Sequence, residues 1–156
     1  MKKTFVVFAV LFAAGPVLAE WLYNPSTRLL TEVVEEGVTP WVIQASSASS
    51  GHNIYLASNG CVKSGPSDKR RLDLDMPIRD ANGMDYYIVG AGDYALSTTL
   101  VGEFVFPSNL TAVPTYFFRN CTSMTNCIFR SNLETIGDNA FRNLQMANGH
   151  YASWQV

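Results

Sequence analysis

The spacing of apolar side chains predicts a repeated structure in the second half of this 156-residue chain. Between positions 101 and 143, apolar and aromatic side chains recur at the constant spacing that separates Val101 from Met124. The other matched pairs are Phe104 with Cys127, Phe106 with Phe129, Leu110 with Leu133, Val113 with Ile136 and Phe118 with Phe141. A constant period in the twenties is typical of a solenoid, in which each coil stacks on its neighbours.

Within each repeat, alternating apolar residues predict one short strand, because successive side chains of a strand point to opposite faces. In VGEFVFPSN and MTNCIFRSN, the side chains predicted to share a dry interior are Phe104, Phe106, Cys127 and Phe129. The intervening positions then face outward, and we predict a binding face there that consists of Glu103, Val105, Asn126 and Ile128. The alternative is that Val105 and Ile128 cover a neighbouring element.

Two further segments complete each coil. TYFFRN and GDNAFRN predict short helical turns, from which Phe118 and Phe141 dock into the core. YIVGAGDYALSTT reads as an earlier, less regular unit. Because such stacks usually need at least three repeats, we expect the N-terminal region to cover the open end of the first one.

Residues 20–86 read as short strands separated by turns. Strand segments such as WVIQAS and NIYLAS alternate with breaks such as SSASSGHN and KSGPSD. Asn82-Gly83 lies between two strand segments and is a strong signal for a two-residue hairpin. We expect a small antiparallel sheet that shields the edge of the first repeat strand.

Residues 1–19 have the pattern of a secretory signal peptide. Lys2 and Lys3 precede the uncharged run TFVVFAVLFAA, and cleavage is expected after Ala19. The run is shorter than the roughly 20 residues that a membrane anchor needs, so no integral membrane segment is expected after cleavage. The chain then divides into a signal peptide (1–19), a β-rich capping region (20–86), the repeats (87–145) and a tail (146–156). This tail either caps the stack or ends a shortened protein.

The net charge limits the class of partner that the protein can bind. Loss of Lys2 and Lys3 with the signal peptide leaves nine of the 11 basic side chains against 13 acidic ones, without a basic stripe. This composition argues against nucleic acid as a partner.

Cys121 and Cys127 occupy repeat positions that take apolar residues, so we expect both to be small buried hydrophobes. A disulfide between them is the alternative, since export permits one. Cys61 brings the number of cysteines to three, and an odd number in an exported protein means that at least one is free or pairs with another chain.

The repeat motifs resemble the BspA-type leucine-rich repeat, a family of exported bacterial repeat proteins. LETIGDNAFRN is similar to the family's L-x-x-I-G-x-x-A-F element, and Phe118-Arg119-Asn120-Cys121 to the aromatic-to-cysteine step that often follows it. The resemblance covers about residues 87–145, with two clear repeats and one degenerate repeat. It implies a β-rich fold with a minor helical part: a short leucine-rich-repeat solenoid behind the small antiparallel region. It also implies surface interaction and attachment to a host or matrix.

Candidate chemistry is sparse. Asp80, Asn82 and Asp85 form D-x-N-G-x-D, but the bidentate Glu of a calcium loop is missing, so a hairpin turn is the favoured interpretation. Asp73 and Asp75 share one strand face without a visible pocket. His52 lies in a loop of Ser, Ala and Gly without a nucleophile-elbow motif. We therefore assign no catalytic, cofactor-binding or metal-binding residue.

Three functions are open on these grounds. The first is an exported, non-enzymatic binding or adhesion module that holds a protein or glycan on the strand face, because a solenoid creates an extended surface. The second is an exported hydrolase acting on polysaccharide, or an accessory protein of such an enzyme. For the hydrolase, Asp73, Asp75 and Asp85 are the candidate acids. The third is a truncated remnant without an independent role.

Overall fold

The computed structural model describes residues 20–49, 51–68, 70–130 and 132–144. The predicted signal peptide and its cleavage position after Ala19 lie outside these residues, as does the predicted C-terminal tail. The described part consists of strands and turns without a helix, so the β-rich class is confirmed.

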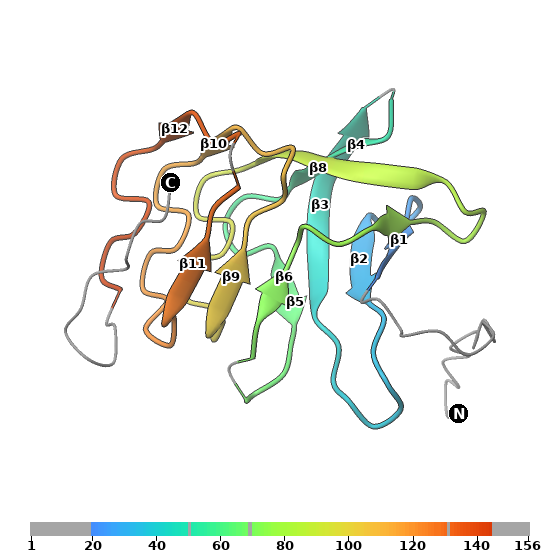
Figure 1. Ribbon diagram of the computed structural model, residues 1–156, viewed down its shortest axis with the longest axis horizontal. Coiled ribbons are helices and arrows are strands. Elements are labelled where there is room, and N and C mark those ends of the chain that lie inside the picture. Colours follow the sequence, from blue (N-terminus) through green and yellow to red (C-terminus); the bar gives the residue numbers. More distant parts are fainter. Residues whose placement is uncertain (1–19, 50, 69, 131, 145–156) are drawn as a thin grey trace.

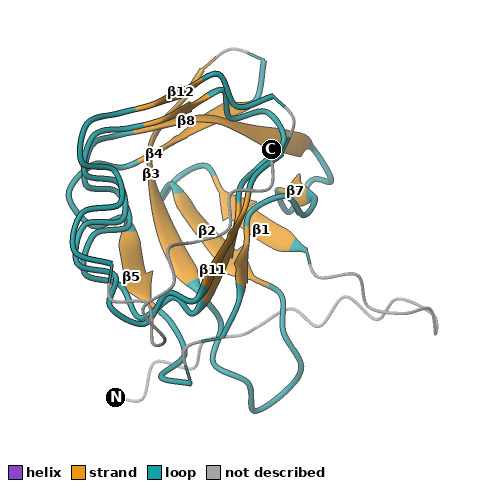
Figure 2. Ribbon diagram, turned by 60° about the vertical axis from the view of Figure 1, so that its left-hand side comes forward, coloured by secondary structure: helices purple, strands orange, loops and turns teal. Residues whose placement is uncertain are grey.

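The first half of the chain forms a sheet that closes on itself (Figure 2). Its strands are β1 (Trp21–Asn24), β2 (Leu29–Glu32), β3 (Val42–Ser49), β4 (Asn53–Leu56), β5 (Val62–Ser64), β7 (Ile78–Arg79) and β8 (Asp85–Ala91). The order is β2-β1-β7-β8-β4-β3-β5, and β2 also pairs with β3, which closes the ring into a small barrel.

The predicted small antiparallel sheet is therefore wrong in size and in topology. Two of its pairings, β1 with β7 and β4 with β8, are parallel. Parallel neighbours need a crossover connection. Here the chain leaves the closed sheet after β5, forms β6 (Leu72–Asp73) in a separate sheet, and returns to the closed sheet at β7. The predicted hairpin is confirmed, because β7 and β8 are antiparallel around Asn82-Gly83. Its loop is longer than the two residues predicted, because Arg79 pairs with Asp85 and residues 80–84 lie between them.

The repeats lie side by side as parallel strands (Figure 1). β11 (Asn126–Ile128), β9 (Glu103–Val105) and β6 form one three-stranded sheet, and β10 (Ala112–Val113) pairs with β12 (Thr135–Ile136) in another. Phe104 is opposite Cys127 and Val113 is opposite Ile136, so the pairing follows the predicted period. The closed barrel, which the predicted solenoid did not include, is nevertheless the largest element of the fold.

The corners between these strands are turns, and the predicted short helical turns are wrong. Tyr94, Tyr116 and Asn139, at equivalent places in successive coils, all have φ between 55° and 59°. A left-handed residue inside the segment is incompatible with a right-handed helix. The backbone instead bonds from coil to coil: Leu96 N–H donates to Phe117 C=O at 3.0 Å.

The same ladder continues in both directions. Phe118 N–H donates to Ala140 C=O at 2.7 Å, and Cys61 N–H donates to Ala95 C=O at 2.7 Å. The turn after β4 thus stacks under the irregular unit that contains Ala95, which in turn stacks on the first clear repeat. The closed sheet and the repeats are joined by continuous backbone hydrogen bonding.

Two tryptophans cover the free edge of β6. Trp21 Nε1–H donates to the Asp73 carbonyl at 2.8 Å, and Trp41 Nε1–H donates to the Arg71 carbonyl at 3.2 Å. Both rings are buried. An unpaired strand edge is a site for aggregation. The two indole N–H groups satisfy backbone carbonyls on the edge of β6 that does not pair with β9.

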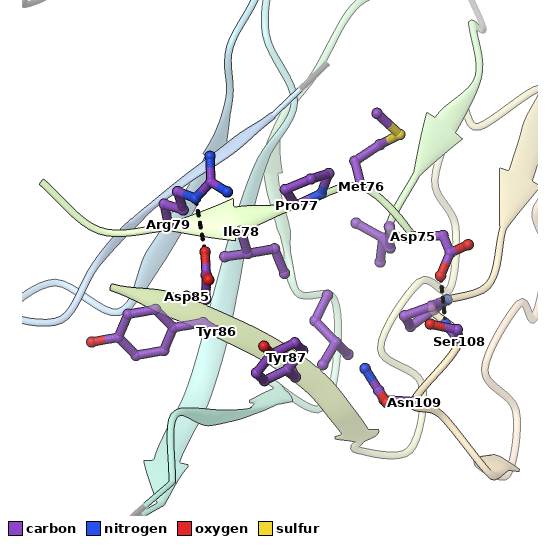
Figure 3. Close-up of a pocket in the computed structure, with 13 residues that line it drawn as sticks. Asp75, Met76, Pro77, Ile78, Arg79, Asp85, Tyr86, Tyr87, Ser108 and Asn109 are labelled. Atoms are coloured by element: carbon purple, nitrogen blue, oxygen red, sulfur yellow. Dashed lines mark hydrogen bonds and ion pairs between the residues drawn. The ribbon is translucent and has the colours of Figure 1, made fainter. Parts of the chain in front are cut away.

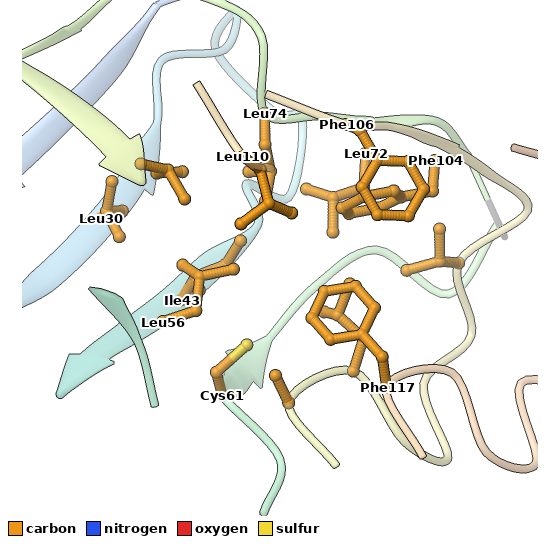
Figure 4. Close-up of a cluster of buried hydrophobic side chains, with 14 of the residues drawn as sticks. Leu30, Ile43, Leu56, Cys61, Leu72, Leu74, Phe104, Phe106, Leu110 and Phe117 are labelled. Atoms are coloured by element: carbon orange, nitrogen blue, oxygen red, sulfur yellow. The ribbon is translucent and has the colours of Figure 1, made fainter. Parts of the chain in front are cut away.

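One apolar core runs through both halves of the chain (Figure 4). Phe104, Phe106 and Cys127 are buried, and Phe129 packs against the cluster from a partly exposed position. The predicted interior of the repeats is therefore confirmed. The rings of Phe104 and Phe106 meet edge to face at 4.7 Å between centroids.

The three thiols are free and buried, which confirms the interpretation of Cys121 and Cys127 as small interior residues. The Cys121 thiol donates to the Leu96 carbonyl at 2.9 Å. Burial raises the pKa of the Cys61 and Cys127 thiols to about 12.

Candidate functional site

The outward side of β6, β9 and β11 carries the predicted binding residues. Strand register places Asn126 beside Glu103, and Ile128 beside Val105, which is beside Asp73. We call the exposed part of this surface the strand face and define it by Arg71, Asp73, Glu103, Asn126 and Ile128. The parallel stacking of the coils brings these residues together from three segments of the chain (Figure 1).

A network of charge-assisted hydrogen bonds crosses the strand face. Arg71 Nη2 donates to Asp73 Oδ2 at 2.6 Å, and Arg71 Nη1 donates to Glu103 Oε1 at 2.9 Å. Asn126 Nδ2 donates to the second oxygen of Glu103 at 3.0 Å. The hydrogen bond from Arg71 to Asp73 raises the pKa of the arginine, so its positive charge is secured. Side chains of all three strands are thereby held in fixed positions.

Val105 departs from the prediction. Its side chain has 0% exposure, although it lies on the opposite side of the strand from Phe104 and Phe106. The expectation of an exposed Val105 is therefore wrong, and the alternative that it is covered fits its burial. Glu103, Asn126 and Ile128 retain partial exposure. Their role in binding stays a prediction.

The three candidate acids of the hydrolase hypothesis each form an ion pair with arginine. Asp73 binds Arg71 at 2.6 Å, Asp75 Oδ2 binds Arg130 Nε at 2.8 Å, and Asp85 Oδ1 binds Arg79 Nε at 2.7 Å. A glycoside hydrolase turns two carboxyl groups toward one scissile bond, whereas each of these acids is turned toward an arginine.

Two of these acids line a pocket that the sequence did not reveal (Figure 3). The pocket has a volume of about 310 Å³ and lies between the β7–β8 hairpin and the turn after β9. Asp75 and Asp85 line it together with Arg79, Tyr87 and Asn109. Asp75 Oδ1 also accepts a hydrogen bond from Ser108 N–H at 2.6 Å, which ties the repeat turn to the pocket wall.

Asp80 has a structural task in the hairpin. Its Oδ1 accepts hydrogen bonds from the backbone N–H groups of Asn82 and Met84, each at 2.9 Å. The bond from Met84 is the main reason why the pKa of Asp80 lies below its ordinary value. This geometry matches the hairpin interpretation of D-x-N-G-x-D. Within residues 20–49, 51–68, 70–130 and 132–144, no cluster of three or more His, Cys, Asp or Glu could hold a metal ion.

His52 belongs to the turn between β3 and β4. Its backbone is left-handed, with φ of 61°, and its ring meets the edge of Tyr86 at 5.1 Å between centroids. The structure therefore places this histidine against an aromatic ring of β8. The serine-rich segment before it forms the end of β3.

Comparison with protein families identifies the second half of the chain. Residues 86–153 match the family model of the BspA type leucine rich repeat region (6 copies). This region therefore belongs to the BspA-type leucine-rich repeats, as the motif LETIGDNAFRN indicates. The family is a generally non-enzymatic repeat family whose members are typically exported or surface proteins, and it marks this region as a module of the kind that serves protein interaction.

No curated protein matches the chain, and no solved structure matches it. A helix long and apolar enough to span a bilayer does not occur in the described part of the chain.

The pocket and its aromatic wall were missed because their residues are far apart in sequence. Arg79, Tyr87 and Asn109 belong to β7, β8 and the turn after β9. The only local signal was the Asn82-Gly83 hairpin, which brings β7 beside β8. Nothing in the repeat pattern indicates that the turn after Phe106 closes against this hairpin.

Proposed function

We propose that the protein is an exported, non-enzymatic binding module that holds a protein ligand on the strand face. The observation that carries this proposal is the network of Arg71, Asp73, Glu103 and Asn126 across three strands. Groups that are ordered before binding lose less conformational freedom in the complex. The membership of residues 86–153 in a repeat family of exported surface proteins supports the same conclusion.

A protein ligand is favoured over a glycan at this surface. The strand face presents fixed charges of both signs, with Ile128 as an apolar neighbour. Complementary charges on a protein surface select the partner and its orientation, whereas a neutral sugar has no charges to match. Charge pairing at such a surface mainly increases the rate of association and makes it sensitive to salt.

A hydrolase is the weaker candidate. Asp75 and Asp85 line one pocket, which is the observation in its favour. Each of them is already engaged by an arginine, Asp75 by Arg130 and Asp85 by Arg79, instead of being turned as a free pair toward a substrate.

Export and binding are tested with the full chain. It is expressed in a secretion-competent bacterium, and the culture medium, envelope and cytoplasm are compared for the protein and for loss of residues 1–19. Retention in the cytoplasm at full length would contradict export. The secreted protein is then measured by surface plasmon resonance against an array of purified extracellular-matrix proteins.

Two variants decide whether the strand face is the binding surface. Arg71→Glu places a third acid beside Asp73 and Glu103, and Ile128→Asp removes the apolar neighbour. We expect each to weaken binding by about tenfold or more, corresponding to roughly 1.4 kcal/mol. The matched control is Ile136→Asp, because Ile136 is exposed on β12 at another side of the same coil. Equal binding by all variants, with unchanged circular dichroism, would place the ligand elsewhere.

A further inference from the structure

The pocket between β7, β8 and the turn after β9 has the size of a small-molecule site. Its volume is about 310 Å³, at the lower end of the range of roughly 300–1,000 Å³ typical of ligand pockets. Figure 3 shows Arg79 and Asp85 on one side, and Asp75, Ser108 and Asn109 on the other. The closed sheet and the first clear repeat both contribute to the pocket walls.

The acids at the pocket are already paired with arginines. Asp85 pairs with Arg79, which also binds Glu20 at 3.0 Å, and Asp75 pairs with Arg130. Neither carboxylate is thus an unpaired charge that would attract a free cation. Ionised carboxylates, hydroxyl groups and side-chain amides nevertheless retain lone pairs that accept further hydrogen bonds. Such a lining suits an uncharged ligand rich in hydroxyl groups.

An aromatic surface continues from the pocket across the outer face of the closed sheet. Tyr87 lines the pocket and is 48% exposed, and Tyr55 on the neighbouring strand β4 is 41% exposed. In the parallel pair β4–β8, Asn53 lies beside Tyr87, and Tyr55 lies beside Gly90. Tyr87 and Gly90 are three positions apart on β8, so the two tyrosines are separated by about 10 Å along the strands.

Gly90 holds the second ring in place. A Cβ atom at this position would lie 2.5 Å from Tyr55 Cδ1 and 2.7 Å from its Cε1. The Tyr55 ring therefore lies directly over the backbone of β8, with part of its surface open to solvent. Any side chain at residue 90 would displace the ring.

We propose that this pocket, together with Tyr87 and Tyr55, binds a neutral oligosaccharide. The apolar C–H faces of sugar rings pack on exposed aromatic rings, while their hydroxyl groups bond to the polar pocket wall. One sugar ring occupies the pocket against Tyr87, and the chain extends along β8 toward Tyr55. This site is separate from the strand face and does not depend on a protein ligand there.

Binding is tested with the full chain by isothermal titration against the hexasaccharides of cellulose, xylan, starch and chitin, with polygalacturonate as an acidic probe. At least one neutral hexasaccharide is expected to bind. Tyr87→Ala should weaken this binding about tenfold, because it removes the ring on which a sugar face packs. Tyr87→Phe keeps the ring and should bind within about twofold to threefold of the wild type.

Gly90→Ala tests the second ring without altering the pocket. It should reduce the affinity for a hexasaccharide but leave the affinity for a disaccharide unchanged. Binding of polygalacturonate alone, binding of none of the neutral sugars, or equal binding by Tyr87→Ala would overturn the proposal. Ile128→Asp separates the two sites, because it should weaken protein binding at the strand face and leave sugar binding intact.

Discussion

Replacement of Gly137 by alanine tests how closely the coils approach each other. Gly137 is the glycine of the L-x-x-I-G-x-x-A-F element, and it lies against the backbone of the preceding coil. A Cβ atom there would be 2.6 Å from Thr115 N, 2.8 Å from Pro114 C and 3.0 Å from Val113 O. All three are backbone atoms, which cannot rotate away as the end of a side chain can. At Gly92, in the same corner of an earlier coil, an added Cβ atom would lie 2.0 Å from Ser58 Oγ and 2.9 Å from Ser58 Cα.

The cost of this replacement follows from the geometry. Ordinary contacts begin near 3.4 Å, so the two coils must separate by about 0.8 Å at this corner. Gly137 N–H donates to Val113 C=O at 2.7 Å, and the same displacement would stretch that hydrogen bond to the limit of its range. Overpacking costs about 1–3 kcal/mol, and a weakened backbone hydrogen bond adds about 1 kcal/mol. We expect a loss of about 2–4 kcal/mol in the free energy of unfolding.

Urea unfolding of the full chain, followed by tryptophan fluorescence and circular dichroism, measures this loss as a lower midpoint with an unchanged slope. Thr135→Ala alters an exposed side chain on β12, two positions before Gly137, and should stay within about 0.5 kcal/mol of the wild type. Gly60→Ala has open space but φ of 84°, so it reports the cost of backbone conformation alone. A Gly137→Ala variant as stable as Thr135→Ala would refute the close approach of the coils.

Two further predictions concern pH. The pKa of Asp80 lies below its ordinary value of 3.8 in the folded state, so its stabilising effect is present above that pH and is lost as the pH falls through the lowered value. Asp80→Asn should therefore be less stable at pH 7, and the difference should shrink as unfolding is measured at pH values progressively below 3.8. The folded-state pKa values of Cys61 and Cys127, about 12 against an ordinary 9.0, favour the neutral thiol, so stability should fall as the pH rises from 9 to 12. At pH 8 both thiols should react with Ellman's reagent only after unfolding, and rapid reaction of the native protein would contradict their burial.

The amino-acid sequence by itself determined the period, the register of the repeat strands and the identity of their interior. Phe104 is opposite Cys127 because a constant repeat length places equivalent residues in adjacent coils, and alternation along a strand decides which of them face inward. The hairpin at Asn82-Gly83 and the burial of Cys121 could also be predicted, because both depend on local chemistry or on repeat position.

The tertiary structure alone decided the closed sheet, the form of the corners, the burial of Val105 and the pocket. The parallel pairing of β4 with β8 joins segments that β5, β6 and β7 separate along the chain, and no local pattern encodes such a partner. The corners were predicted as helical because apolar spacing resembles a helical turn, yet their backbone N–H groups find acceptors in the adjacent coil. Alternation along β9 places Val105 on the outward side of the strand. Its burial nevertheless depends on which other parts of the folded chain cover that side. Periodicity describes neighbours along the chain, whereas pairing and covering depend on residues brought together only by folding.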